Sequence, residues 1–337
     1  AGHLAPGAAA EPLVAAALLM TRHGDLEGAR SLVEWALREK PREAVANDAA
    51  LCQALLRSLG GDVEAIPLVQ ELGLTALYRL LDSAEDGDRL PPLATYCGLV
   101  LAATGQLIAS DGFLSTALRS VRNPVPGGGF AGLLACRADV NLRIGRLDLA
   151  EAMSSDAVTA SSAAPGDRPL TLAIRARVLL HLGRIEECRG VIAQFERLLD
   201  PREDAFAGMW ARTVQAELFL LQENVHEAAR VYAELIGDTE RSGLVLPGMV
   251  GWEVTALESL VRAGQIGVAE DLLERQNAAA ASSPSLRYAE VVSALGHGLV
   301  AEHRGTPAVA EERLRRAAAL AEGLPGAFER AATKQLL

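Results

Sequence analysis

The side chains that could do chemistry in this chain of 337 residues are widely scattered. His297 and His303 are six residues apart, a spacing that does not place two side chains on one face of a helix, and no H-E-x-x-H motif or cysteine–histidine cluster accompanies them. Glu85, Asp86 and Asp88 form an acidic turn without the remaining ligands of a calcium loop. We therefore predict no metal site.

The sequence also contains no motif for nucleotide binding or for nucleophilic catalysis. Only two lysines occur, Lys40 and Lys334, and neither completes a G-x-x-x-x-G-K-[ST] phosphate loop. No serine, cysteine or histidine lies in a recognisable nucleophile motif, and the paired D-D-x-x-D carboxylates of an all-α cyclase are absent. The sequence predicts a segment with no catalytic residue and no cofactor of its own, and so not an enzyme.

The charge and composition of the chain bear on its binding partners and on its location. The formal net charge is −11, which opposes binding to a phosphate backbone. Neither a signal peptide nor an apolar run of about 18 residues is present, so we expect a cytoplasmic protein without a membrane segment. Cys52, Cys97, Cys136 and Cys188 form no C-x-x-C pair and are expected to be small core residues.

The clearest pattern in the chain is a repeat built on small residues. A glycine is followed five residues later by Ala, Ser or Cys, as in Gly145 and Ala150, and the pattern occurs eight times, with Glu223 once in place of glycine. The turn positions are Gly24, Gly60, Gly105, Gly145, Gly183, Glu223, Gly264 and Gly305, at intervals of 36 to 45 residues. Such a period is typical of stacked helical hairpins.

A second column of small residues stands seven positions before each turn, where six of the eight residues are Ala or Gly. Small residues that face one another let paired helices approach to the short end of the usual spacing of about 8–10 Å. The predicted fold class is all-α, a right-handed superhelical solenoid of about eight tetratricopeptide-like helix pairs. Trp35 and Trp252 are interpreted as packing residues within it.

Breaks in the repeat suggest how the chain is divided. We expect a linker over residues 1–9 and N-terminal repeats over 10–122, with an extra helix near 75–83. A Pro/Gly hinge loop is expected over 123–129. C-terminal repeats over 130–337 should follow, including a helix over 248–263, and should end in an unpaired helix from residue 326.

The first helix of each pair lines the concave face of a tetratricopeptide stack, so counting back from each turn gives candidate groove positions. The predicted effector or partner groove comprises Arg143, Arg177, His181, Trp210, Thr213, Glu217, Glu258, Arg262 and His303. The same count also places Glu11, Thr21, Arg22, Asn47, Arg57, Ser58, Thr95 and Glu302 on this face. Such a mixture can orient a small molecule or an extended peptide through charge-assisted hydrogen bonds, although polar residues also face water on any solenoid.

Two stretches carry a family resemblance. Residues 1–41, AGHLAPGAAAEPLVAAALLMTRHGDLEGARSLVEWALREKP, resemble the start of the helical repeats in the large ATP-binding LuxR-type regulators, the MalT-like proteins. Residues 308–337, AVAEERLRRAAALAEGLPGAFERAATKQLL, are similar to the repeat that precedes their DNA-binding module. The resemblance implies a tetratricopeptide-like middle region that receives an inducer or a regulatory protein. ATP and DNA would then be bound by other domains of a longer chain.

We therefore expect a non-catalytic sensor superhelix of a MalT-like transcriptional activator, which binds an effector small molecule or a partner protein on its concave face. An effector that favours one curvature of the superhelix would shift its conformational equilibrium. Expected contacts also include the regulator's own ATPase domain and a second copy of the chain. The alternative hypothesis is a free-standing tetratricopeptide adaptor. Phosphate-loop and helix-turn-helix sequences in the flanking gene would support the regulator hypothesis over the adaptor hypothesis.

Overall fold

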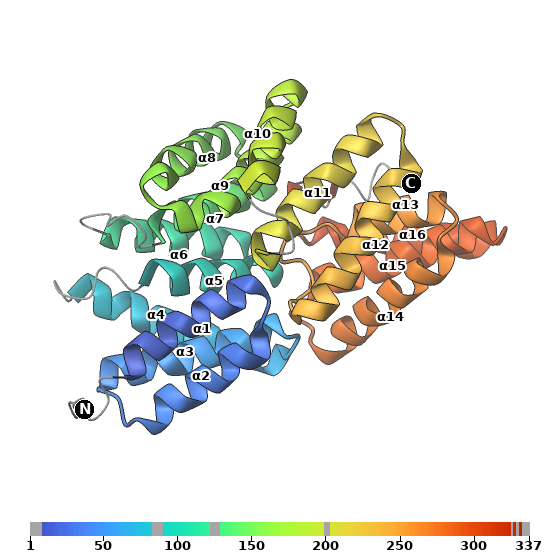
Figure 1. Ribbon diagram of the computed structural model, residues 1–337. Helices are drawn as coiled ribbons and strands as arrows, with labels where there is room; N and C mark the ends of the chain where they lie inside the picture. Colours follow the sequence, from blue (N-terminus) through green and yellow to red (C-terminus); the bar gives the residue numbers. More distant parts are fainter. Residues whose placement is uncertain are drawn as a thin grey trace.

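The structure is a computed structural model that describes residues 9–82, 90–121, 129–198, 203–324, 326, 327, 330 and 331. Sixteen α-helices occur in these residues, together with three short 3-10 turns and no strand, and the helices stack as successive pairs (Figure 1). The pairs are α1 (Ala10–His23) with α2 (Leu26–Arg38), α3 (Glu43–Leu59) with α4 (Ile66–Asp82), α5 (Leu90–Ala103) with α6 (Leu107–Ser120), α7 (Phe130–Ile144) with α8 (Leu147–Ala160), α9 (Arg168–His181) with α10 (Ile185–Leu198), α11 (Ala205–Leu221) with α12 (Val225–Ser242), α13 (Glu253–Arg262) with α14 (Ile266–Ser282), and α15 (Arg287–His303) with α16 (Pro307–Glu322). The predicted all-α solenoid of helix pairs is confirmed.

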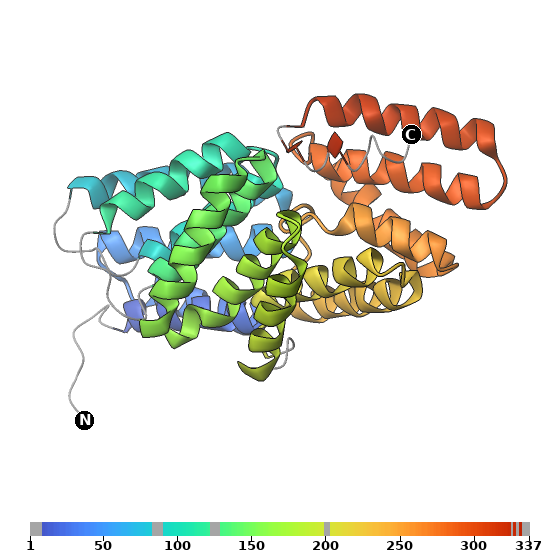
Figure 2. The ribbon, with the colours of Figure 1, turned by 90° about the horizontal axis from the view of Figure 1, so that it is seen from above.

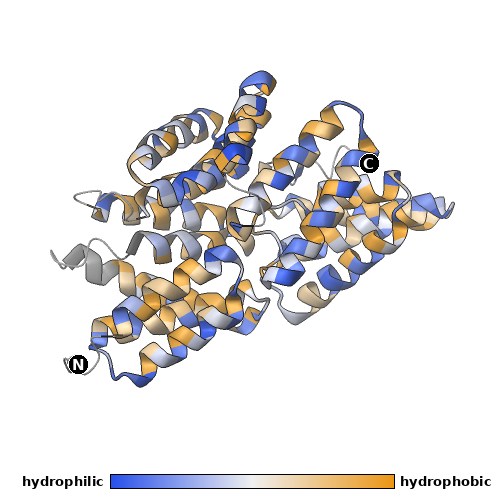
Figure 3. Cartoon of the chain, in the orientation of Figure 1, coloured by the Kyte–Doolittle hydropathy of each residue, from blue (hydrophilic) through white to orange (hydrophobic). Residues whose placement is uncertain are grey.

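The small residues make this close stacking possible. The residue five positions after each turn is buried in all eight pairs, including Ser110 of α6 and Ala150 of α8. In the third pair the two columns touch, because the Ser110 hydroxyl donates a hydrogen bond of 2.7 Å to the carbonyl oxygen of Gly98 in α5. A Cβ at Gly98 would lie only 2.4 Å from Cδ2 of Leu114. Hydrophobic and hydrophilic residues share most helices, as Figure 3 shows.

Each first helix ends in a left-handed residue at its turn. Gly24 has φ 82° and Gly145 has φ 96°, and their backbone N–H groups donate to carbonyl groups of the preceding helix turn. Glu223 adopts the same conformation with φ 58°, although it carries a side chain. In the second pair this role belongs to Gly61, at φ 85°, because Gly60 has φ −80°. The repeat therefore sets the position of seven turns and misses the second by one residue.

The superhelix closes on itself after six pairs. The inner helices α1, α3, α5, α7, α9 and α11 follow one another around the concave side, and the start of α11 returns to the C-terminal end of α1 (Figure 1). Arg22 Nε lies 2.5 Å from Asp204 Oδ2, and His23 Nδ1 lies 2.6 Å from the carbonyl oxygen of Glu203. Helices α13 to α16 extend beyond this ring (Figure 2).

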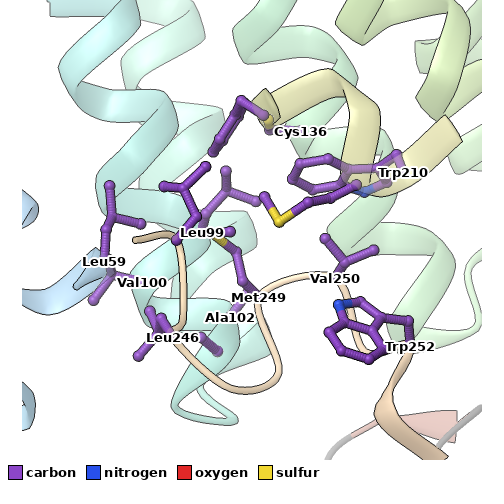
Figure 4. Close-up of a cluster of buried hydrophobic side chains, with 14 of the residues drawn as sticks. Leu59, Leu99, Val100, Ala102, Cys136, Trp210, Leu246, Met249, Val250 and Trp252 are labelled. Carbon is purple, nitrogen blue, oxygen red and sulfur yellow. The ribbon is translucent and has the colours of Figure 1, made fainter. Parts of the chain in front are cut away.

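A non-helical segment with several turns runs through the interior between α12 and α13, and we call residues 243–252 the strap. The N–H groups of Val245 and Leu246 both donate to the carbonyl oxygen of Leu59, at 3.0 and 3.2 Å. Leu244, Leu246, Met249 and Val250 are buried. Their surroundings include Leu59, Leu99, Val100, Ala102, Cys136 and Trp210 (Figure 4).

The strap corrects one expectation. We predicted a helix over 248–263, but α13 begins only at Glu253. Gly248 has φ 74°, outside the right-handed helical region, so a helix does not begin there. The carboxylate of Glu253 instead accepts the N–H of Gly248 at 2.8 Å, which fixes the end of the strap.

The other predicted divisions of the chain are compared with the structure as far as the described residues allow. The separate helix near 75–83 does not form, because α4 continues without interruption to Asp82. The linker over 1–9 and the hinge over 123–129 lie outside the described residues apart from Ala9 and Gly129. Of the expected final helix, only Gly326, Ala327, Arg330 and Ala331 are described.

Candidate functional site

The concave face contains a cavity of about 460 Å³ at the end opposite the strap. Helix α1 forms one side, and the first turns of α3, α5, α7 and α9 with Phe206 of α11 complete the wall. The lining residues from α1 are Glu11, Pro12, Val14, Ala15, Leu18, Leu19 and Arg22, which lie on one face because they follow helical spacing. Among them Leu19 is 60% exposed, so the cavity opens to solvent beside α1.

The cavity wall is mainly apolar. Leu18, Leu93 and Leu170 contribute aliphatic side chains, and Tyr96 and Phe206 contribute rings whose centroids are 5.0 Å apart in an edge-to-face contact. Both aromatic side chains are buried. A cavity of this size with apolar walls and a few polar groups has the character of a ligand site.

Four charged residues line the cavity: Glu11, Asp48, Asp167 and Arg22. Arg22 is also the residue that closes the ring, because its Nε contacts Asp204 at 2.5 Å while its Nη1 lies 3.5 Å from Asp167 Oδ1. Burial lowers the pKa of the guanidinium, but Asp204 and Asp167 outweigh burial and raise it overall. Nη2 of Arg22 is buried without a hydrogen-bond partner among the described residues.

Of the two carboxylates that contact Arg22, Asp167 is held less closely than Asp204. Its two partners are both distant, Arg22 Nη1 at 3.5 Å and the N–H of Gly132 at 3.3 Å. Burial raises the pKa of Asp167, and the attraction of Arg22 and the Gly132 hydrogen bond only partly counteract it. Asp167 is thus a carboxylate in the cavity wall that further positive charge would stabilise.

The predicted groove residues lie elsewhere, and several of them are internal. Trp210 is fully buried, and its Nε1 donates to Asp139 Oδ1 at 3.2 Å. Arg177 Nη1 contacts the same oxygen at 2.8 Å, and Asp139 itself has no exposed surface. Thr213 is buried as well and donates to the carbonyl oxygen of Met209. These side chains join α7, α9 and α11, instead of facing an open groove as we expected.

Glu217 and His181 stand beside that cluster. His181 Nε2 lies 3.8 Å from Glu217 Oε2, but burial, with Arg177 nearby, lowers the pKa of His181 to about 3. The histidine is therefore neutral near pH 7, and this contact is not an ion pair there. Burial raises the pKa of Glu217 to about 7, since Arg177 offsets only part of the desolvation.

The remaining groove residues are not brought together with these. Arg143 is buried, and its Nη1 donates to the strap at Met249 O over 3.4 Å. Glu258 and Arg262 pair with each other at 2.9 Å on α13, and His303 is exposed at the end of α15. Their role in effector binding stays a prediction.

Sequence reasoning missed several residues that the structure makes central. Asp139 stands six residues before Gly145, on the same register that selected Arg177 and Glu217, so the pattern contained its signal. Asp167 and Asp204 lie at or before helix starts, outside that register, and no spacing marks them. Of the eight further concave positions, Glu11, Arg22 and Thr95 line the cavity.

The tryptophans divide between interior and surface. Trp252 is buried and stacks on Tyr232 with a centroid distance of 6.4 Å, as expected for a packing residue. Trp35 is 52% exposed on α2, and its indole N–H donates to Glu39, so its interpretation as a packing residue was wrong. All four cysteines are buried free thiols.

The described residues contain neither a metal-binding cluster nor a membrane-spanning helix. No group of three or more His, Cys, Asp or Glu side chains there is arranged to hold a metal ion. Within the same ranges, no helix combines the length and apolar character needed to cross a membrane.

Known proteins resemble this chain in structure but not in sequence. No protein-family model matches it, and no curated protein matches it either. A Rap protein complexed with competence and sporulation factor is similar with a TM-score of 0.57 at 12% identity, over 98% of this chain and 96% of that one. A chain of the APC/C hetero-tetramer Cut9–Hcn1 gives a TM-score of 0.58 at 12% identity, over 96% of this chain and 55% of that one.

At these identities the likeness concerns the fold alone. The chain has a tetratricopeptide-like repeat fold.

Proposed function

We propose that this chain is a binding superhelix that takes a segment of a partner protein into the cavity beside α1. The observation that carries the proposal is the cavity itself, about 460 Å³ with largely apolar walls on the concave face of a tetratricopeptide-like ring. Buried side chains of the strap occupy another part of that interior, and the cavity is a part of the concave side with room for a ligand. No catalytic role is proposed.

At a finer level, we propose that the superhelix is the sensor region of a MalT-like transcriptional regulator. The resemblance of residues 1–41 and 308–337 to that family supports this role. Binding at the cavity would be coupled to superhelix curvature because Arg22 both lines the cavity and closes the ring through Asp204. The sequence of the gene tests the regulator hypothesis, which predicts phosphate-loop and helix-turn-helix sequences on either side of this segment. If both are absent from the gene, the adaptor hypothesis is favoured.

A blocking substitution tests the cavity. Ala15 lies in the cavity wall and is solvent-exposed, so Ala15→Trp should fill the opening without disturbing the buried side of α1. Peptides selected from a random display library on the wild-type chain should lose most of their affinity for this variant in calorimetric titration. Ala278→Trp on the exposed side of α14 is the matched control and should bind normally. Equal binding to both variants would place the partner site elsewhere.

A further inference from the structure

We propose that the occupant of the cavity is a short peptide segment that carries a basic side chain, Lys or Arg, next to apolar side chains. This inference rests on the proposed function and specifies the chemistry of its partner. It follows from the charges, the walls and the hydrogen-bonding groups of the cavity, taken in turn.

The charge of the wall favours a cation. Three carboxylates, Glu11, Asp48 and Asp167, line the cavity against one guanidinium, that of Arg22. The Arg22 charge is already engaged by Asp204, a buried carboxylate 2.5 Å behind it. Because carboxylates outnumber guanidinium groups among the lining residues, a basic ligand is favoured over an acidic one, and its attraction is stronger inside an apolar cavity than in water.

Asp167 is the residue that would receive the basic group. Its nearest hydrogen-bond donors are 3.3 and 3.5 Å away, at the long end for such contacts, and its side chain is 14% exposed. A ligand cation could approach to the shorter distance of a charge-assisted hydrogen bond. Gly166, directly before it, has open space where a Cβ would be, which leaves room for that approach.

The remaining wall fits the apolar part and the backbone of a peptide. Leu18 and Leu93, with Phe206 of α11, offer apolar contact, and Leu19 at the opening is exposed without covering. Nη2 of Arg22 is buried without an acceptor among the described residues, so a peptide carbonyl oxygen would accept from it once the side chain shifts toward the cavity. A simple alkylamine would supply the charge but no such oxygen, which favours a peptide.

Three matched pentapeptides test the charge requirement. The probes are acetylated and amidated Leu-Leu-Xaa-Leu-Ala with lysine, glutamine or glutamate at the third position, titrated by isothermal calorimetry at 50 mM NaCl. We expect the lysine peptide to bind at least ten-fold more tightly than the glutamine peptide, with no binding of the glutamate peptide. Equal affinities, a preference for glutamate, or no binding of the lysine peptide would overturn the inference.

Substitutions locate the basic group. Asp167→Asn should weaken binding of the lysine peptide at least ten-fold while leaving the weak binding of the glutamine peptide unchanged. Asp156→Asn, on the exposed side of α8, is the matched control and should have no effect. Should Asp167→Asn fail to fold by circular dichroism, Glu11→Gln on α1 tests the same wall and should reduce the lysine preference several-fold. Unchanged preference in the folded variant would refute the assignment.

The two proposals fail differently. Loss of selected peptides with Ala15→Trp, combined with no preference for lysine, would keep the cavity as the partner site and reject a basic occupant. Full binding of the lysine peptide to Ala15→Trp would reject the cavity itself.

Discussion

Gly98 offers a direct test of how the stack is held together. A methyl group added there would lie 2.4, 2.7 and 2.9 Å from Cδ2, Cγ and Cδ1 of Leu114. Leu114 has no exposed surface and cannot turn away without moving its neighbours. Two effects oppose each other in Gly98→Ala, because alanine is the better helix former by about 1 kcal/mol, whereas overpacking a core costs about 1–3 kcal/mol. With three contacts below van der Waals distance, we expect overpacking to dominate and the net loss to be up to about 2 kcal/mol.

Gly112 provides the matched control in the partner helix. It lies on the exposed side of α6, and an added Cβ would meet nothing within 4 Å. Gly112→Ala should therefore stabilise the chain by up to about 1 kcal/mol through helix propensity alone. The same substitution is thus expected to act in opposite directions on two helices of one pair.

The assay is urea unfolding followed by circular dichroism at 222 nm. Repeat arrays can unfold in steps, so midpoints are compared only where the slopes of the transitions agree. The reasoning is refuted if Gly98→Ala is as stable as the wild type or more stable. It is also refuted if Gly112→Ala loses stability to the same extent, since propensity and packing would then not be the opposing effects.

Three further predictions concern the turn, the buried carboxyl group and the strap. Glu223→Gly should raise the urea midpoint and stabilise the chain by up to about 1 kcal/mol. A left-handed residue with a side chain costs about 1–2 kcal/mol, and the greater flexibility of unfolded glycine offsets part of the gain from removing it. A lower midpoint would contradict this prediction. Glu217→Gln should be more stable than the wild type at pH 8 and equal to it at pH 4. The pKa of Glu217 in the folded chain, about 7, lies above its ordinary value of 4.5, so the wild-type chain loses about 1–3 kcal/mol of stability as the pH rises from 4.5 through 7. A stability difference between the variant and the wild type that does not change with pH would exclude this cause. Leu246→Ala should lower stability by about 2–5 kcal/mol in the same assay, and a loss below about 1 kcal/mol would show that the strap is not part of the core.

The site was less predictable than the helices. Counting back from the turns correctly placed Glu11, Arg22 and Thr95 on the concave side, yet we favoured the second half of the chain because its polar residues are more varied. There the same register leads into the interior, where Arg177 and Trp210 share the carboxylate of Asp139. A register gives the direction of a side chain relative to its helix pair, but its exposure depends on what the superhelix places opposite it.

Local sequence alone determined the stacking unit of this protein. Small residues on facing helices and a left-handed turn between them act within one pair and between neighbours, so their spacing along the chain predicts the eight helix pairs and the place where each pair turns. Only the tertiary structure decided that α11 returns to α1, that residues 243–252 run through the interior, and that a cavity remains beside Ala15 and Leu19. These features arise from small rotations summed over six pairs and from contacts between residues about 180 positions apart, such as Arg22 and Asp204, which no repeat pattern contains.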